Sequence, residues 1–329
     1  MIFTTGAQQV HSPSASDLQT LRMKFQDEPW TGMAEAGFPS GERVVFLFSG
    51  GMIKCSYRTN NNITQKRDAE LEWGSLLRSL PSNLTFNTLG VSALRLARIV
   101  LEHPVPAETL LVQDGRLDHV LDQWHQQSHP NLAVLTWFDR QEIVMLWPGK
   151  TVPPATVLLS ARGASEESGN AGAILSPRMG ECDAVRHEFV SDGGAWEEYG
   201  FQFISVRLLG ALLARYKELT GLALLNALDR NINRIAFENR WDFSITLGVI
   251  TDRMFFCNLD ETIEVCKTLL QVACDHIAVV LGQKLSRSMV QDVIATLDVH
   301  SMRVIEKYSI DAFLGLPRNV LTSEERANV

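Results

Sequence analysis

Three histidines lie close together in the sequence and have spacing that could bind a metal ion: His119, His125 and His129. On a helix, residues four apart such as His125 and His129 lie on one side, where two imidazoles could share a cation. Pro130 follows His129 directly, and the residue before a proline is disfavoured in helical conformation. The second ligand would therefore leave the helix. We interpret these residues as solvated surface histidines and expect no metal site.

A second candidate, Gly149-Lys150-Thr151, matches the end of a phosphate-binding loop. Such a loop needs another glycine five positions before its second glycine, so that the backbone N–H groups can surround a phosphate. Val144 occupies that position, inside a run expected to be a strand. The pair Gly50-Gly51 joins two expected strands, which predicts a hairpin turn and not a dinucleotide-binding fingerprint. We therefore expect no bound cofactor.

Candidate nucleophiles occur without the neighbours that would activate them. Ser49 precedes two glycines but lacks the Gly-x-Ser-x-Gly turn that exposes a nucleophilic serine. Cys274 and His276 are two residues apart, which on a helix separates them by about 200°. We interpret them as a core cysteine and a surface histidine. The sequence predicts a protein without catalytic activity, and an unrecognised hydrolase stays open because a triad can assemble from distant residues.

Two arginines suggest an alternative, ligand-binding function. Arg230 and Arg234 are four residues apart on an expected helix and could form an anion pocket. Together with a mobile loop, this pocket would make the protein a small-molecule or nucleotide sensor whose site lies in the C-terminal helical domain. The other interpretation is an exposed helix face with neighbouring charges four residues apart.

The composition argues against several classes of protein. The net charge is −8 with a pI near 5.5, and no Lys/Arg-rich run appears, so we expect no nucleic-acid partner. No stretch reaches the roughly 18 apolar residues of a transmembrane helix. The five cysteines are scattered and include no Cys-x-x-Cys pair, which predicts a reduced, cytoplasmic protein.

The alternation of apolar patterns with turn residues predicts an α+β fold, with small β-hairpin and helix modules followed by a helical C-terminal domain. At 329 residues the chain is long for a single domain. The second region follows a loose variation of the first one's plan. The expected parts are a flexible tail over 1–16, an α+β module over 17–105, a second α+β region over 106–195 with a mobile loop near 163–180, a helical domain over 196–317 and a tail over 318–329.

Within the first module, capping and breaking residues set the expected elements. Asp17 is the expected N-cap of the first helix, and the second helix is expected to turn Leu71, Trp73, Leu76, Leu77 and Leu80 inward. The expected order is helix 17–26, strand 30–35, turn 38–41, strand 44–48, turn 49–51, strand 52–57, polar loop 59–64, helix 67–79, strand 84–88 and helix 93–101.

Farther along the chain, longer helices are expected. Two of them, 259–280 and 290–308, carry apolar residues at alternating spacings of four and three and predict an antiparallel helical hairpin. This hairpin is expected to pack on the preceding helices or to form a homodimer through residues 259–308. The other expected elements are helix 117–127, strands 131–138, 142–147 and 156–160, helices 203–219 and 222–237, and a hairpin over 243–257 that turns at Thr251-Asp252.

The first part of the chain carries a series of short motifs that together resemble a known family. They are Thr31-Gly32, Phe48-Ser49-Gly50-Gly51-Met52-Ile53, Gly74-Ser75-Leu76-Leu77 and Leu84-Thr85-Phe86. A strand with Thr-Gly, a hairpin after a phenylalanine, a glycine-led helix and a Phe-containing strand follow one another in this order. Over residues 17–103 the chain thus resembles the PATAN domain family of bacterial signalling proteins. The resemblance implies an interaction or output module without catalytic activity.

These expectations combine into a cytoplasmic signalling adaptor or scaffold that acts by protein–protein interaction. Its N-terminal module would bind a protein partner, such as a response regulator or another signalling protein. The residues expected to contact that partner are the exposed ones beside the first hairpin: Ser49, Gly50, Lys54, Arg58, Asn60, Asn61 and Asn62.

Overall fold

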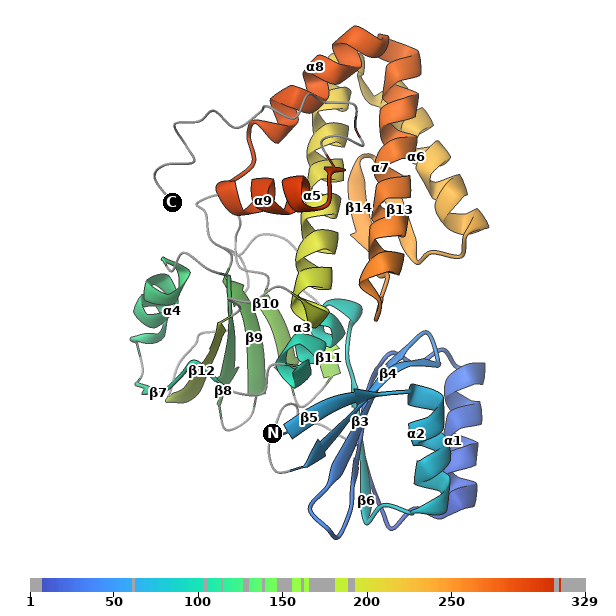
Figure 1. Cartoon of the computed structure of the whole chain (residues 1–329), viewed down its shortest axis with the longest axis vertical. Coiled ribbons are helices and arrows are strands. Elements are labelled where there is room, and N and C mark those ends of the chain that lie inside the picture. Colours follow the sequence, from blue (N-terminus) through green and yellow to red (C-terminus); the bar gives the residue numbers. More distant parts are fainter. Residues whose placement is uncertain are drawn as a thin grey trace. The chain divides into compact units, whose positions relative to one another are not determined.

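The computed structural model describes residues 8–60, 63–102, 106–113, 115–126, 130–137, 140–146, 156–160, 163–165, 181–188, 193–310 and 314. These residues form nine helices and three antiparallel sheets, which confirms the expected α+β class (Figure 1). The chain divides into two compact units, Met1–Trp196 and Glu197–Val329. Two six-stranded sheets belong to the first unit, and the second unit is mostly helical.

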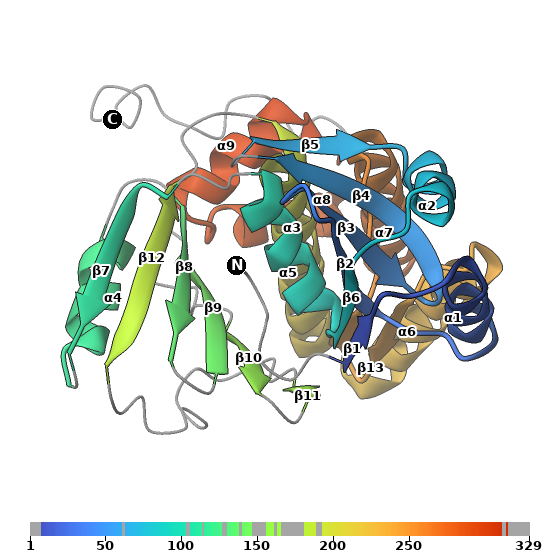
Figure 2. The ribbon, with the colours of Figure 1, turned by 90° about the horizontal axis from the view of Figure 1, so that it is seen from below.

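The first sheet contains six strands, and every neighbouring pair is antiparallel. Two helices, α1 (Ala15–Asp27) and α2 (Ala69–Arg78), cover one face, and α3 (Val91–Glu102) lies on the other face (Figure 2). Across the sheet the strands lie in the order β1 (Gln8–His11), β6 (Asn83–Thr88), β2 (Gly32–Gly37), β3 (Arg43–Ser49), β4 (Met52–Asn60) and β5 (Ile63–Arg67).

Alternate residues of β3 form the centre of the face that α1 and α2 cover. Val44, Phe46 and Phe48 are buried and point to one side, because successive side chains of a strand alternate between its faces. Trp73 of α2 packs edge-on against Phe46 with ring centroids 5.1 Å apart, and Phe25 of α1 packs edge-on against Phe48 at 5.3 Å. Burying each such side chain stabilises the fold by about 1.5–3 kcal/mol.

The second sheet also has six antiparallel strands, and α4 (Leu117–His125) covers one of its faces. Leu117, Leu121 and Trp124 of that helix are buried against Ala133 and Leu135 of the sheet. From edge to edge the strands are β7 (Glu108–Val112), β12 (Cys182–Glu188), β8 (Asn131–Thr136), β9 (Arg140–Leu146), β10 (Thr156–Ser160) and β11 (Gly163–Ser165).

In the second unit, a short β-hairpin lies along a helix. Asn233 exchanges two hydrogen bonds of 2.7 Å with the backbone of Ile245, and Gly248 N donates to Oδ2 of Asp229 at 3.1 Å. These bonds fasten the hairpin to α6. The elements are α5 (Gly194–Thr220), which begins in the first unit, α6 (Leu222–Glu238), β13 (Phe243–Thr246), β14 (Val249–Asp252), α7 (Leu259–Leu281), α8 (Gln283–Ile294) and α9 (Val299–Lys307).

The segment expected to be a flexible tail over 1–16 carries a strand and a helix cap among its described residues. Ser14 is the N-cap of α1: its Oγ accepts a hydrogen bond from Asp17 N at 3.2 Å, and Asp17 Oδ2 accepts one from Ser14 N at 2.9 Å. The expectation that Asp17 caps this helix is therefore wrong, since Asp17 is the reciprocal partner of a capping box. The Ser-x-x-Asp spacing is the sequence signal for this start.

Most of the expected polar loop over 59–64 is instead the hairpin of β4 and β5, in which Thr59 pairs with Thr64. Strands β5, β7 and β12 are all absent from the expected elements. An edge strand such as β5 presents polar residues to water, so Ile63–Arg67 lacks the apolar alternation that marks a strand. In the expected mobile loop, Gly163–Ser165 form β11, and 166–180 lie outside the described residues, as do 318–329.

Two leucines of the second expected helix face outward, contrary to prediction. Leu71 is 73% exposed, because it lies about 200° around α2 from the buried Trp73. Leu80 is exposed as well and lies beyond Ser79, the C-cap of this helix.

The second unit departs from the expected elements at two turns. The short hairpin turns at Leu247 and Gly248, both with positive φ, and not at Thr251-Asp252, which belong to β14. The expected helix over 290–308 is two helices, because Asp298 caps a new one: its Oδ1 accepts a hydrogen bond from Ser301 N at 2.9 Å. A further helix, α5, begins at Gly194 and not at residue 203.

The turn between β3 and β4 gives a stability test with a matched control. Both Gly50 and Gly51 have positive φ, but a Cβ on Gly51 would lie 2.1 Å from the carbonyl oxygen of Phe25, whereas one on Gly50 would meet nothing within 4 Å. Gly50→Ala should cost about 1–2 kcal/mol of backbone strain. Gly51→Ala should cost about 2–5 kcal/mol, because the end of α1 must also move.

Urea denaturation of both variants measures this difference in the free energy of unfolding. Equal losses for Gly50→Ala and Gly51→Ala would show that the turn does not approach α1 as closely as described.

Candidate functional site

The described members of the expected partner-binding set are spread along a strand. Ser49 and Gly50 lie at the turn where β4 begins, and Gly50 N donates to Oγ1 of Thr31 at 3.1 Å. Asn60 lies at the opposite end of β4, eight residues from Met52 and therefore about 26 Å away. Exposed Lys54 lies between these ends. The other two residues of the set, Asn61 and Asn62, lie outside the described residues.

Arg58, also expected to contact a partner, is held by two carboxylates. Its Nη1 lies 2.9 Å from Oε1 of Glu42, and its Nη2 lies 2.6 Å from Oε2 of Glu72. The hydrogen bond to Glu72 is the main reason that the pKa of Arg58 is raised above its ordinary value. Arg58 thus joins β4 to α2 and to the turn before β3, which leaves its guanidinium less available to a partner than an exposed arginine would be.

A buried polar network on the other face of the first sheet escaped the sequence analysis. The Tyr57 hydroxyl donates to Oε1 of Glu102 at 2.7 Å, and Arg98 Nε lies 3.1 Å from that hydroxyl and 3.2 Å from the same carboxylate oxygen. Oε2 of Glu102 accepts a hydrogen bond from Ala195 N at 2.5 Å. The available signal was an Arg and a Glu four residues apart at the end of a mostly apolar helix.

The protonation states in this network follow from its surroundings. Burial alone would raise the pKa of Glu102, but the charge of Arg98 and the hydrogen bonds from Tyr57 and Ala195 outweigh it, so this pKa lies below its ordinary value of 4.5. Burial also raises the pKa of the Tyr57 hydroxyl, which therefore stays protonated and can donate. Every named group has a partner, and the network is suited to joining β4, α3 and the first turn of α5.

In the second unit, α6 presents different residues to its two neighbours. Asp229 and Asn233 bind the β13–β14 hairpin, and the side chain of Asn231 lies about 200° around the helix from Asp229. Asn231, Arg234 and Ile235 therefore face α7 instead. One side of α6 thus holds the hairpin, and another side lines a groove.

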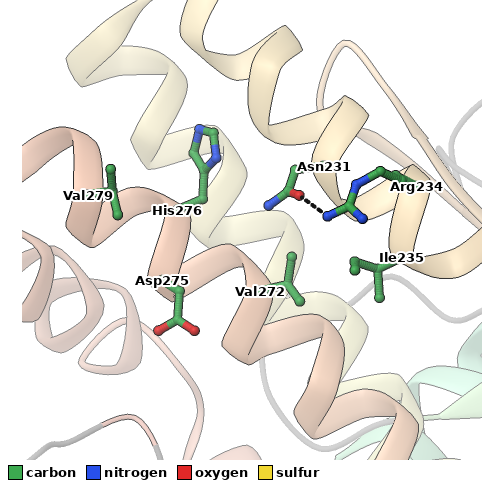
Figure 3. Close-up of a pocket in the computed structure, with 7 residues that line it drawn as sticks. All are labelled: Asn231, Arg234, Ile235, Val272, Asp275, His276 and Val279. Carbon is green, nitrogen blue, oxygen red and sulfur yellow. Dashed lines mark hydrogen bonds between the residues drawn. The ribbon is translucent and has the colours of Figure 1, made fainter.

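The groove between α6 and α7 encloses about 340 Å³, near the lower end of the range for small-molecule sites (Figure 3). Its apolar wall combines a residue of α6 with two of α7, and its polar groups include both signs of charge. The lining residues are Asn231, Arg234, Ile235, Val272, Asp275, His276 and Val279.

The charged side chains of the groove are exposed and make few bonds to the rest of the protein. Nη1 of Arg234 lies 2.8 Å from Oε1 of Glu238, and its Nη2 donates to Oδ1 of Asn231 at 3.2 Å. The Arg234 side chain nevertheless remains 58% exposed. Asp275 accepts a hydrogen bond from Gln271 at 2.6 Å. Because exposed ion pairs are weak, both charges can exchange these partners for those of a bound molecule.

Among the described side chains that line the groove, one buried polar atom has no hydrogen bond. This atom is Nε2 of His276. Its ring packs edge-on against buried Tyr216, with centroids 6.2 Å apart. Burial lowers the pKa of His276, so the imidazole is neutral near pH 7. The expected surface histidine and the expected core cysteine, Cys274, are thus both half-buried. Burial also raises the pKa of nearby Cys274 to about 12, which keeps that thiol protonated.

The two arginines of the alternative ligand site are separated by the fold. Arg234 lines the groove, whereas Arg230 is exposed and does not line it. The two share one helix face only in part, because residues four apart differ by about 40°. Sequence spacing identified one groove residue and missed His276 and Asp275, which come from a different helix.

Other candidates from the sequence remain isolated. Within the described ranges, no three His, Cys, Asp or Glu side chains gather as metal ligands would. His119 is exposed, His125 ends α4, and His129 lies outside those ranges, as does Gly149-Lys150-Thr151. None of the described helices has the length and apolar character needed to cross a bilayer.

Comparisons of the chain with protein-family models, with curated proteins and with solved structures found no match.

The buried network predicts a pH-dependent contribution to stability. Glu102→Gln removes the negative charge beside buried Arg98 and should cost about 3–5 kcal/mol near pH 7. Since the pKa of Glu102 is depressed in the folded state, its contribution is present above pH 4.5 and is lost as the pH falls through the folded value. The difference in the free energy of unfolding between wild type and Glu102→Gln should therefore become smaller as the pH falls.

Denaturant unfolding at a series of pH values tests this, with Glu70→Gln as control. Glu70 pairs with Arg22 at the surface, where its side chain is 62% exposed, so this change should cost at most about 1 kcal/mol. An equally small loss for Glu102→Gln would contradict the network.

Proposed function

We propose that this protein is a non-catalytic adaptor of bacterial signalling that acts in the cytoplasm by binding other proteins. The observation that carries the proposal is the strong exposure of one apolar side chain on each of the two helices that form the groove, α6 and α7. Val279, in the lining of the groove, is 86% exposed, and Phe237, one helical turn beyond Arg234, is 85% exposed. Large apolar side chains this exposed favour burial by a partner.

The make-up of the groove supports a protein partner. Val272 and Ile235 provide apolar wall, while Arg234 and Asp275 provide polar groups of opposite charge. An amphipathic helix that enters such a groove buries its apolar side there and pairs its charges at the rim. This proposal moves the main contact from the first hairpin to the second unit. The expected homodimer through residues 259–308 remains part of it, since α7 forms one wall.

A pull-down from the native host's lysate with the full chain tests the adaptor function. Phe237→Ser combined with Val279→Ser should abolish capture of a specific signalling protein, because each change removes apolar area that the partner would bury. Leu71→Ser, at a leucine of α2 that is 73% exposed, should leave capture intact. Capture by both variants would exclude the groove as contact site, and capture by neither wild type nor variants would contradict the adaptor function.

A small-molecule sensor is the second candidate, and the unpartnered Nε2 of His276 favours it. A neutral imidazole can accept or donate one hydrogen bond, and Arg234 on the facing helix can bind a carboxylate or phosphate oxygen. A small anion with an apolar part would pair with Arg234 and cover the apolar wall.

Thermal unfolding with AMP, ATP, inorganic phosphate and simple carboxylates as probes tests the sensor function. A ligand at 100 times its Kd should add about 2.7 kcal/mol of stability. Arg234→Gln should abolish that shift, whereas Arg230→Gln, outside the groove, should keep it. A shift that survives Arg234→Gln would place the ligand elsewhere, and no shift with any probe would count against the sensor.

A further inference from the structure

The two sheets of the first unit have the same topology. Read along the chain, the first is built as β1, α1, β2, β3, β4, β5, α2, β6 and α3, and the second as β7, α4, β8, β9, β10, β11, β12 and α5. The position of α2 corresponds to 166–180, outside the described residues. In space the orders are β1-β6-β2-β3-β4-β5 and β7-β12-β8-β9-β10-β11. Each strand therefore has a counterpart with the same neighbours.

The hydrogen-bond registers agree as well, at a nearly constant spacing in sequence. Ala34 pairs with Phe46 in the first sheet, and Ala133, 99 positions after Ala34, pairs with Val144, 98 positions after Phe46. The same comparison holds for four further pairings, with offsets of 98 to 100. These are Gly32–Thr88 with Asn131–Glu188, Gln8–Phe86 with Glu108–Arg186, Phe46–Ser56 with Val144–Thr156, and Arg58–Gln65 with Leu158–Ser165.

The core side chains repeat at the same offset. Each of four apolar residues in the first core has an apolar counterpart 99 positions later in the second core: Leu18 with Leu117, Leu21 with Val120, Phe25 with Trp124, and Phe38 with Trp137. An amphipathic helix could match another by chance at several shifts. The helices here match at the shift that the strand registers independently require.

One difference between the two copies lies at Phe86 and its counterpart. In the first, Phe86 packs with Phe25 and Trp30, at centroid distances of 5.5 and 6.1 Å. Its counterpart in the second is Arg186, whose Nε lies 3.2 Å from Oε2 of Glu108.

The neighbours of Arg186 are exchanged too. Its Nη1 donates to Oδ1 of Asn131 at 3.1 Å and to Oε2 of Glu188 at 3.2 Å. Oε2 of Glu108 also accepts a hydrogen bond from Trp124 Nε1 at 3.1 Å. Glu108 and Asn131 are the counterparts of Gln8 and Gly32, at offsets of 100 and 99. Three matched positions that carry Gln, Gly and Phe in the first copy thus carry Glu, Asn and Arg in the second, where the Arg binds both of the others.

We infer that the first unit consists of two tandem copies of one module, and that Glu108, Asn131 and Arg186 were exchanged as a set in the second copy. In this arrangement α5 is the counterpart of α3, prolonged into the second unit. The inference is independent of the adaptor and sensor proposals, since it rests on strand order, register and core positions.

Reverting the exchanged set in the full chain tests the inference. Arg186→Phe alone removes the guanidinium that Glu108 and Asn131 bind and should lower the temperature of unfolding. Adding Glu108→Gln and Asn131→Gly installs the residues of the first copy at all three places and should recover most of that loss.

A second variant with the phenylalanine shifted by one residue is the control. It tests whether position 186 in particular, and not any position of β12, accepts an aromatic side chain. Val185→Phe combined with Glu108→Gln and Asn131→Gly places the ring on the opposite face of β12, because one residue along a strand reverses the side chain. This control should unfold at a lower temperature than the triple variant. If Arg186→Phe does not fold, a folded circular-dichroism spectrum of the triple variant counts as recovery. A triple variant no better than Arg186→Phe, or no better than the shifted control, would overturn the inference.

Discussion

The packing of an amphipathic helix on the apolar face of a sheet is the interaction on which each half of the first unit depends. In the first half, Phe25 stacks on Trp30 with ring centroids 4.4 Å apart and meets Phe48 of β3 edge-on. The backbone of the same residue lies so close to Gly51 that a side chain there would collide with it. Helix end, strand and turn therefore meet at one residue, and none of the three can shift alone.

Charged groups in this protein divide into those that join elements and those that remain available. Arg58 and Arg98 each have carboxylate partners contributed by the surrounding structure, and Arg207 likewise pairs with Asp298 at 2.8 Å. A buried charge without such partners would be costly, so these arginines serve to stabilise the fold. Arg234 differs because its pairs are exposed and it lines a groove that has an apolar wall. Exposure and surroundings, which arginine content alone does not reveal, distinguish a structural arginine from a candidate binding group.

Much of the architecture follows from sequence because strong apolar patterns depend only on local order. The strand with Val44, Phe46 and Phe48 and the paired glycines after it are examples, as is the long helix after residue 258. Edge strands and polar networks do not have this property. The strand Ile63–Arg67 looks like a loop because its outward residues face water. Tyr57 and Glu102 are 45 positions apart, so no local spacing announces their hydrogen bond. The groove likewise combines His276 with Arg234 from a helix much earlier in the chain.

The repeated plan of the first unit was visible in the sequence only as a loose similarity, for the same physical reason. A core position requires apolar volume on the correct face and does not require a particular residue. Phenylalanine can thus become tryptophan, and leucine can become valine, while the pattern persists. Register is less tolerant, because a shift of one residue moves every side chain of a strand to the other face. The register of strand pairing can therefore stay the same in the two sheets after their residue identities have diverged. The exchange of an aromatic residue for an arginine with bonded partners fits this view, because a buried charge is acceptable only where partners surround it.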